Sequence, residues 1–305
     1  MRIGMIIGAD GVNRTLADLV KQAQRLEEMK FDSISMAQMM SFDAIGALSV
    51  IGSATKRIGL VTAVVPTYPR HPTALASQAL TAAAASGDRF SLGIGLSHKI
   101  VIEGMLGFSY ERPAAHMREY LQVLGPLLRG ETVQHDGDEF HVHGVAVAVP
   151  GTKPVPLLVA ALGPVMLKLT GELADGTVTW MVGPKTMEKH IVPSLTNASR
   201  GAGKTAAPIV VGGFPVVLTN KPDQAREHIA KQLTIYGQLP SYRAMLDREG
   251  VDGPADVALA GDENYLRGAI DRLRNAGVTD LNCAIAAADA QTSERTLQFL
   301  ASLKS

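Results

Sequence analysis

The sequence predicts an α/β fold: a TIM (β/α)8 barrel with a hairpin insertion and a helical insertion before the last strand. Short apolar runs rich in β-branched residues alternate with longer helix-forming stretches, which indicates parallel strands joined by helical crossovers. Eight such units occupy the 305 residues, a usual size for this barrel. Polar residues, glycines and prolines follow the runs 58–65 and 90–94, as expected where strands end at a ligand-binding face.

The predicted strands are short apolar segments bounded by turn residues, as suits strands that are buried on both faces. They cover residues 2–8, 32–38, 58–65, 90–94, 155–161, 177–180, 209–218 and 280–286. Pro66, followed closely by Pro69 and Pro72, should end the third strand, because proline donates no hydrogen bond to a ladder.

The predicted helices follow the strands. Thr15 and Asp18 have the spacing of a capping signal before a one-sided apolar pattern. Residues 73–85 combine alanine with other helix-forming residues, and Gly277 stands where a helix over 264–276 would end. The remaining helices are predicted at 42–53, 113–128, 164–173, 184–200, 222–237 and 294–303.

Two segments interrupt the alternation of strands and helices. Residues 132–149 contain an Asp136–Gly137 step that predicts a hairpin turn. Residues 239–260 read as the second insertion. No long linker or low-complexity stretch divides the chain, so we expect residues 1–305 to form a single domain.

The composition excludes several functional classes. Lys plus Arg and Asp plus Glu both number 29, so no general attraction to nucleic acid or to an anionic membrane is expected. Cys283 is the only cysteine, which excludes an intrachain disulfide. No apolar run of membrane-spanning length and no signal-peptide layout is seen, so a cytoplasmic protein is expected. His141 and His143 lack a third ligand of suitable spacing, so no metal site is expected.

Two loops offer backbone N–H groups to a ligand. In the first, Gly93-x-Gly95-x-x-His98 departs from the dinucleotide fingerprint at its third position, and Lys99 departs from the hydrolase nucleophile elbow. We interpret this loop as a contact to a cofactor's tail or ring edge, with a plain solvated loop as the alternative.

The second loop is the turn Gly163–Met166. Proline suits the first position of a helix, and a glycine before it lets the backbone approach a ligand closely. The free N–H groups and the helix dipole favour a phosphate there. An ordinary helix cap is the alternative.

Several side chains follow predicted strands and could face the barrel mouth. Gln38 ends the second strand, with Phe42 one turn further on, although Phe42 could equally pack in the core. Tyr68 and Arg70 follow the third strand, and Trp180 ends a later strand, where it could line a pocket or pack against a helix. Three histidines on predicted helices are expected at the surface: His116, His190 and His228.

Five segments together resemble the bacterial luciferase-like monooxygenase superfamily, and within it the actinobacterial branch that uses the 5-deazaflavin coenzyme F420. They cover essentially the whole chain: G59-L-V-T-A-V-V-P-T-Y-P-R-H-P; L92-G-I-G-L-S-H-K with V101-I-E-G-M; R112-P-x-x-H-M-R-E-Y-L; A160-A-L-G-P-V-M-L with G171-E-L-A-D-G-T; and L239-P-S-Y-R-A-M-L-D-R-E-G. Their order and spacing are specific for the superfamily and less so for the cofactor.

The resemblance implies a flat ring over the barrel mouth and a non-prolyl cis peptide at Thr62–Ala63 against that ring. The implied cofactor contacts are Gln38, Thr62, Ala63, Val65, Leu96, Ser97, His98, Leu162, Gly163, Val165 and Met166. His98 falls where the sugar-phosphate dehydrogenase branch has an acid–base carboxylate, and Gln38 lies near its proton-donating histidine. An amide cannot donate a proton as imidazolium does, so the sugar-phosphate reaction is not expected.

The resemblance therefore implies a homodimeric F420-dependent oxidoreductase that transfers a hydride between the cofactor and a small organic substrate. His98 and Gln38 are the catalytic candidates, and Phe42, Tyr68 and Trp180 are candidates for the substrate pocket. Two alternatives remain open: a monooxygenase that uses FMN and oxygen, and a flavin- or deazaflavin-binding protein without catalysis.

Overall fold

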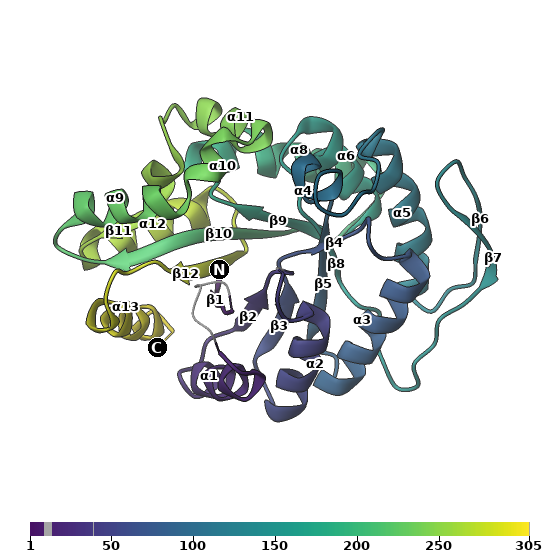
Figure 1. Cartoon of the computed structure of the whole chain (residues 1–305), viewed down its shortest axis with the longest axis horizontal. Coiled ribbons are helices and arrows are strands. Elements are labelled where there is room, and N and C mark those ends of the chain that lie inside the picture. Colours follow the sequence, from purple (N-terminus) through teal and green to yellow (C-terminus); the bar gives the residue numbers. More distant parts are fainter. Residues whose placement is uncertain (9–13, 39, 305) are drawn as a thin grey trace.

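The computed structural model describes residues 1–8, 14–38 and 40–304, and eight parallel strands of this part close into a barrel (Figure 1). In barrel order the strands are β1 (Arg2–Ile6), β2 (Ser33–Met36), β3 (Gly59–Thr62), β5 (Phe90–Gly95), β8 (Leu157–Val159), β9 (Gly176–Trp180), β10 (Ile209–Leu218) and β12 (Asp280–Ile285). Pairing of β12 with β1 closes the ring. Two short strands add to it: β4 (Val65–Pro66) pairs with β5, and β11 (Leu259–Gly261) pairs with β10. The predicted barrel is confirmed.

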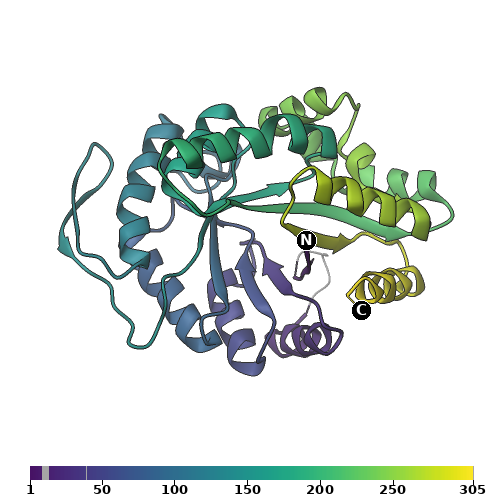
Figure 2. The same cartoon turned by 180° about the vertical axis from the view of Figure 1, so that it is seen from behind.

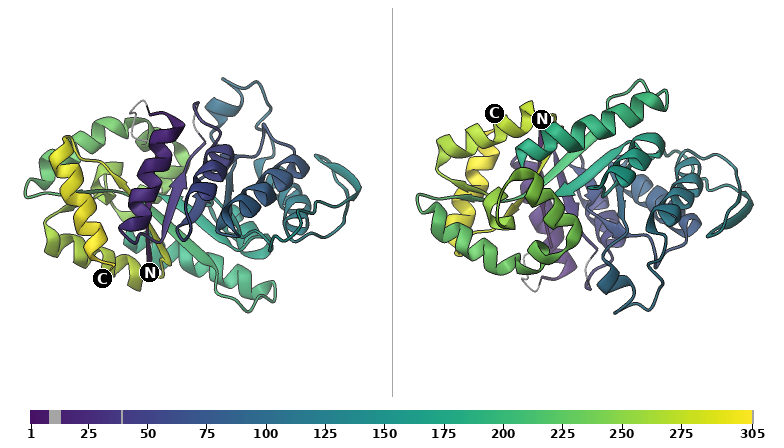
Figure 3. Two further views of the ribbon diagram at one scale, coloured as in Figure 1. Left: turned by 90° about the horizontal axis from the view of Figure 1, so that it is seen from below. Right: turned by 90° about the horizontal axis from the view of Figure 1, so that it is seen from above.

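Helices cover the outside of the barrel, as the views from the front, behind, below and above show (Figures 1, 2 and 3). The bounds are α1 (Leu16–Glu28), α2 (Ala44–Ala54), α3 (Pro72–Ser86), α4 (Lys99–Ile102), α5 (Pro113–Leu128), α6 (Pro164–Leu173), α7 (Pro184–Thr186), α8 (Val192–Gly201), α9 (Pro222–Gln232), α10 (Thr234–Gln238), α11 (Pro240–Glu249), α12 (Glu263–Asn275) and α13 (Ala290–Ser302). A π-helical turn, Met187–Ile191, joins α7 to α8, so the helix expected over 184–200 is continuous. None of the described helices is long and apolar enough to cross a membrane.

Local sequence signals explain where the first helices begin and end. At α1, the Thr15 hydroxyl accepts the N–H of Asp18 while the Asp18 carboxylate accepts the N–H of Thr15, which confirms the capping box. At α3, Pro72 occupies the first turn and Gly87 ends the helix in the left-handed region at φ 61°.

The apolar residues of the described chain form several clusters, two of which bear on the barrel. A large cluster lies between the barrel wall and the surrounding helices. A small separate cluster around Leu158, Val178 and Val211 includes Ala63 and Val64, the residues that follow β3. These two residues therefore pack with side chains from β8, β9 and β10.

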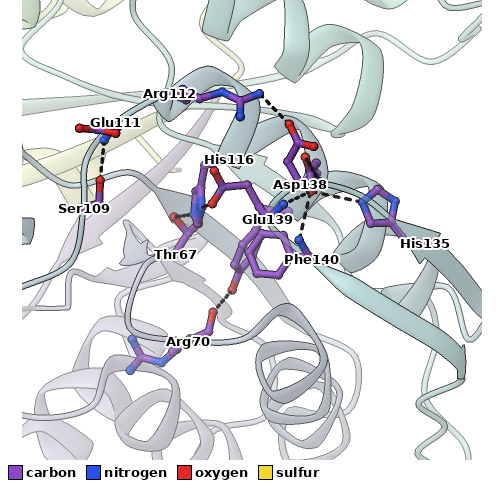
Figure 4. Close-up of polar contacts among 12 residues, drawn as sticks. Thr67, Arg70, Ser109, Glu111, Arg112, His116, His135, Asp138, Glu139 and Phe140 are labelled. Carbon is purple, nitrogen blue, oxygen red and sulfur yellow. Dashed lines mark hydrogen bonds and ion pairs between the residues drawn. The ribbon is translucent and has the colours of Figure 1, made fainter.

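The first insertion is a two-stranded hairpin, β6 (Val133–Asp136) and β7 (His141–Val145), which stands off from the barrel in all views (Figures 1, 2 and 3). Residues 137–140 join the two strands, and the N–H of Gly137 donates to the carbonyl of Phe140 at 3.0 Å, so the hairpin turn expected at the Asp136–Gly137 step is confirmed. The carboxylate of Glu119 on α5 accepts the N–H groups of residues 138, 139 and 140 at 2.8–3.1 Å (Figure 4). One partly buried carboxylate thus ties the turn to the barrel.

The second insertion contains more structure than the sequence indicated. Residues 239–260 form α11, a 3-10 turn (Pro254–Val257) and most of β11. The α10–α11 pair lies above β9 and β10 in Figure 1.

Candidate functional site

The third strand is interrupted at the barrel mouth, where Thr62 ends β3. Its Oγ1 accepts the N–H of Gly93 and donates to the carbonyl of Gly93, both at 2.8 Å. The peptide bond between Ala63 and Val64 is cis, so the expectation of a cis bond at Thr62–Ala63 is wrong by one residue. The reason is that Thr62 keeps its ladder position, and Ala63 N–H still donates to the carbonyl of Met36 at 2.9 Å. The chain therefore leaves the strand only after Ala63.

The Val64 side chain lies across the end of β5. A Cβ at Gly95 would stand 2.8 Å from Val64 Cγ2 and 3.2 Å from the Ala160 side chain, and a Cβ at Gly93 would stand 2.0 Å from the Thr62 carbonyl oxygen. Both positions therefore require glycine, because neighbouring atoms lie too close to leave room for a side chain. The contacts place the ends of β3, β5 and β8 side by side around an apolar floor made by Val64.

Ordinary pairing resumes after the interruption. Val65 pairs with Ile94 and is fully buried, so its side chain belongs to the core. The role that the sequence suggested for Val65, a backbone contact to a cofactor, stays a prediction, as do the predicted contacts of Thr62 and Ala63.

The loop after β5 presents Ser97 and His98. Ser97 adopts the left-handed conformation at φ 59°, and its carbonyl accepts the hydroxyl of Tyr110 at 3.2 Å. Leu96 packs against the core. The His98 ring is half-buried, 6.0 Å from the ring of Tyr242 on α11, and burial lowers the pKa of His98. At neutral pH His98 is therefore a neutral imidazole, able to accept one proton.

The loop after β8 leads into an uncapped helix. Gly163 is the N-cap of α6, no side chain caps the helix, and a Cβ on Gly163 would meet nothing within 4 Å. Val165 is 59% exposed, and Met166 packs partly against the core. The carbonyl of Leu162 accepts the Nε2–H of half-buried His190 at 2.8 Å, which fixes the loop from the other side. His190 is therefore not the free surface side chain that was expected.

The side chain of Gln38 forms hydrogen bonds with nearby residues. Its Oε1 accepts the N–H of Ala44 at 3.0 Å and Arg70 Nη2 at 3.3 Å, and its Nε2 donates to the carbonyl of Phe42 at 3.4 Å. Arg70 also forms an ion pair with Asp43 at 2.6 Å. Phe42 packs against the core, the second of its two predicted roles. Gln38 thus fastens the loop after β2 to the loop after β4, and its catalytic role stays a prediction.

Tyr68 follows β4 and stacks on His116, with ring centroids 4.1 Å apart and planes within 4°. Within the described residues the buried Tyr68 hydroxyl has no hydrogen-bond partner. His116 is only 5% exposed, and its Nε2 lies 3.0 Å from the Thr67 hydroxyl (Figure 4). The expected surface position of His116 is wrong because the hairpin covers this face of α5, with Phe140 5.5 Å from the His116 ring.

Trp180 ends β9, and its ring lies against Gly213 of β10, where a Cβ would stand 2.8 Å from Trp180 Cε3. It packs in one apolar cluster with Met181, Tyr236 and Tyr242. Tyr242 was missed as a candidate, although it lies in the last segment that carried the family resemblance. Trp180 therefore packs against the helical insertion, the second of its two expected positions, and its role in a substrate pocket stays a prediction.

In the described part of the chain no group of three or more His, Cys, Asp or Glu side chains is arranged to hold a metal ion. His141 pairs with Asp136, and His143 lies 2.6 Å from the Gln134 amide nitrogen. Both histidines thus contact side chains of the neighbouring strand of the hairpin, β6.

A family model described as luciferase-like monooxygenase matches residues 1–297 of the chain. The chain belongs to the luciferase-like monooxygenase family.

Within this family, a 5,10-methylenetetrahydromethanopterin reductase from Methanolobus tindarius is 28% identical over 241 residues, which cover 78% of this chain and 73% of that protein. A Mycobacterium tuberculosis protein, provisionally named a coenzyme F420-dependent oxidoreductase, is 32% identical over 200 residues, or 61% of this chain and 57% of that protein. The solved structure of an F420-dependent secondary alcohol dehydrogenase with an F420–acetone adduct superimposes with a TM-score of 0.81. It shares 20% identity and covers 98% of this chain and 97% of its own, which shows a common fold.

Proposed function

We propose that this luciferase-like monooxygenase family member is a coenzyme F420-dependent oxidoreductase that transfers a hydride between the deazaflavin and a small organic substrate. The observation that carries the proposal is the arrangement at the mouth. Gly95 lies against Val64 and Ala160 where three neighbouring strands end, and the uncapped start of α6 follows three residues after Ala160. The similarity to the mycobacterial protein supports the choice of cofactor.

The residues present fit a cofactor with a flat ring and an anionic tail. Val64 offers an apolar surface to the ring, and the glycines of β5 leave the room that the Val64 side chain needs there. At α6, Gly163 leaves open space before a helix whose first-turn N–H groups precede the first intrahelical bond, from Leu167 N–H to the Gly163 carbonyl. The helix dipole adds to the attraction for a phosphate. Gly163, Val165 and Met166 would hold the tail, with Leu162 shaping the loop.

A bound deazaflavin supplies the hydride carrier. His98 supplies the proton chemistry: an alcohol carbon that loses a hydride also releases its hydroxyl proton, and the neutral imidazole accepts that proton at its unprotonated ring nitrogen. In the reverse direction, imidazolium returns the proton to the oxygen of the carbonyl group. Half-burial of the ring beside Tyr242 limits access of water to this exchange.

Reconstitution tests the proposal. The protein is titrated with F420 and, separately, with FMN, and turnover is followed without oxygen by the absorbance of F420 across secondary alcohols, ketones and methylenetetrahydromethanopterin. We expect tighter binding of F420 than of FMN and oxygen-independent turnover with at least one substrate class. Oxygen-dependent turnover with FMN would instead identify a monooxygenase. Tight binding without turnover across the panel would identify a binding protein.

A further inference from the structure

We propose that Tyr242, which the helical insertion brings to the barrel mouth, is a positioning residue for His98. The inference rests on the proposed function, because it assigns to the insertion a part in the proton transfer at His98. It adds a residue outside the strand ends to the reaction site.

Packing is what orients the His98 ring. Its centroid lies 6.0 Å from that of Tyr242, with the planes tilted by 53°. No hydrogen bond or ion pair to the His98 ring occurs among residues 1–8, 14–38 and 40–304, and Tyr242 is the aromatic side chain in contact with it there. A tilted aromatic contact of this kind contributes about 0.5–1.5 kcal/mol beyond burial. Loss of Tyr242 would therefore free the ring to rotate and expose it to water.

Tyr242 is itself held in place. Tyr236 meets it edge-on, with centroids 5.2 Å apart and planes at 86°. Both rings pack against the apolar cluster formed by Met181, which follows β9, Leu246 of α11 and Val257. The tyrosine is thus fixed between the insertion and the barrel.

The helix that carries Tyr242 is anchored at its other end. The Glu249 carboxylate accepts the N–H groups of Lys185 at 3.2 Å and Thr186 at 2.7 Å, and so caps the start of α7. Lys185 Nζ donates back to the Glu249 carbonyl at 3.3 Å. Arg243 donates to the carbonyls of residues 251 and 252 at 2.8 and 2.7 Å, which closes the turn after α11. The insertion is therefore a fixed support.

The charged groups near His98 interact with other partners, so the contact with Tyr242 determines the environment of the His98 ring. Lys99 begins the short helix α4, Glu103 directly follows it, and the two side chains pair with each other at 3.5 Å. From α11 the neighbouring group is the phenol of Tyr242, whereas Arg243 is turned to the carbonyls after α11. Burial is accordingly the cause that lowers the pKa of His98 from its ordinary value of 6.5.

The test compares Tyr242→Phe, which keeps the ring, with Tyr242→Ala, which removes it. Tyr265→Ala, at a tyrosine of α12 that is 38% exposed, is the matched control. The first readout is an NMR titration of the His98 imidazole, assigned with His98→Gln, in protein without cofactor. We expect Tyr242→Ala to raise the pKa of His98 toward 6.5, while Tyr242→Phe and Tyr265→Ala leave it unchanged.

The second readout is the pH profile of F420-dependent turnover. Tyr242→Ala should lower kcat about tenfold and move the acidic limb of the profile upward with the His98 pKa, with the KM for F420 unchanged. A folded Tyr242→Ala variant with an unchanged His98 pKa and profile overturns the proposal. If that variant does not fold, Tyr242→Leu, which keeps apolar bulk without a ring, gives the same comparison. Because the NMR readout needs neither cofactor nor substrate, failure of F420 binding in the wild type would count against the proposed function alone.

Discussion

Replacing Gly163 with aspartate is expected to strengthen α6 while weakening cofactor binding. Gly163 has φ −79° and ψ 157°, which any residue adopts, and a new side chain would meet open space. Aspartate at an N-cap accepts first-turn N–H groups, which favours the helix over glycine by a few tenths of a kcal/mol. Its charge near the positive end of the helix dipole adds about 0.3–1 kcal/mol. The variant should therefore unfold at the same temperature as the wild type or higher.

The same substitution, Gly163→Asp, is expected to weaken binding of the cofactor although it stabilises the helix. The new carboxylate would stand where we propose that the cofactor's phosphate binds. Two like charges 4 Å apart repel by about 1 kcal/mol in water and about 4 kcal/mol at an effective dielectric constant of 20. Because Val165 beside the site is 59% exposed, the lower part of this range applies. A penalty of about 1.4–2.8 kcal/mol corresponds to binding that is about 10-fold to 100-fold weaker.

The matched control is Gly163→Asn, which offers a similar cap without a charge. Affinity for F420 is measured by fluorescence titration at low and high ionic strength, since salt screens an exposed charge pair. We expect weak binding of F420 by the aspartate variant at low salt, partial recovery at high salt, and near wild-type binding by the asparagine variant. Equal affinities of the two variants would show that the start of α6 does not hold the anionic tail.

Three further changes test other parts of the structure. His98→Ala should lower turnover about 100-fold with F420 still bound, and unchanged turnover would remove His98 from the mechanism. Thr62→Val leaves the buried N–H and carbonyl of Gly93 without their partner, so urea unfolding should show a loss of about 2–4 kcal/mol that Thr62→Ser avoids. Burial alone would raise the pKa of Glu119, but the N–H groups of residues 138–140 outweigh it and lower the pKa below 4.5. Its stabilisation is thus present above pH 4.5 and lost as the pH falls through the folded-state value, so Glu119→Gln should cost about 2 kcal/mol at neutral pH, speed amide exchange in the hairpin turn, and flatten the acid dependence of stability.

The barrel could be predicted because its strands are buried on both faces. Such strands appear as short apolar runs, and each of the eight predicted runs overlaps a barrel strand. Their ends were less accurate. The apolar run through Val65 gave no sign that β3 stops at Thr62, because hydrogen bonds to Gly93 and Met36, far away in sequence, decide where the strand stops. The three-residue strand β11 was missed because it is too short for a pattern.

Side-chain positions were harder to predict where an insertion covers them. His116 lies on a helix face that would be exposed in a bare barrel, and the hairpin turn with Phe140 makes it a buried residue. Tyr242 likewise became a candidate only through its contact with His98, which lies 144 positions earlier in the chain. Helical periodicity contains no information about either contact, because the partner belongs to another element.

The glycines of β5 show how a motif that suggests ligand binding can instead be required by packing. Gly93-x-Gly95 resembles part of a phosphate-binding fingerprint, yet a Cβ at either position would collide with Thr62, Val64 or Ala160. The two glycines are therefore needed for contact between neighbouring strand ends, and this need is independent of any ligand. For anion binding we propose another element, the start of α6 after β8. No side chain caps this helix, a side chain at Gly163 would meet open space, and its first-turn N–H groups and its dipole favour an anion.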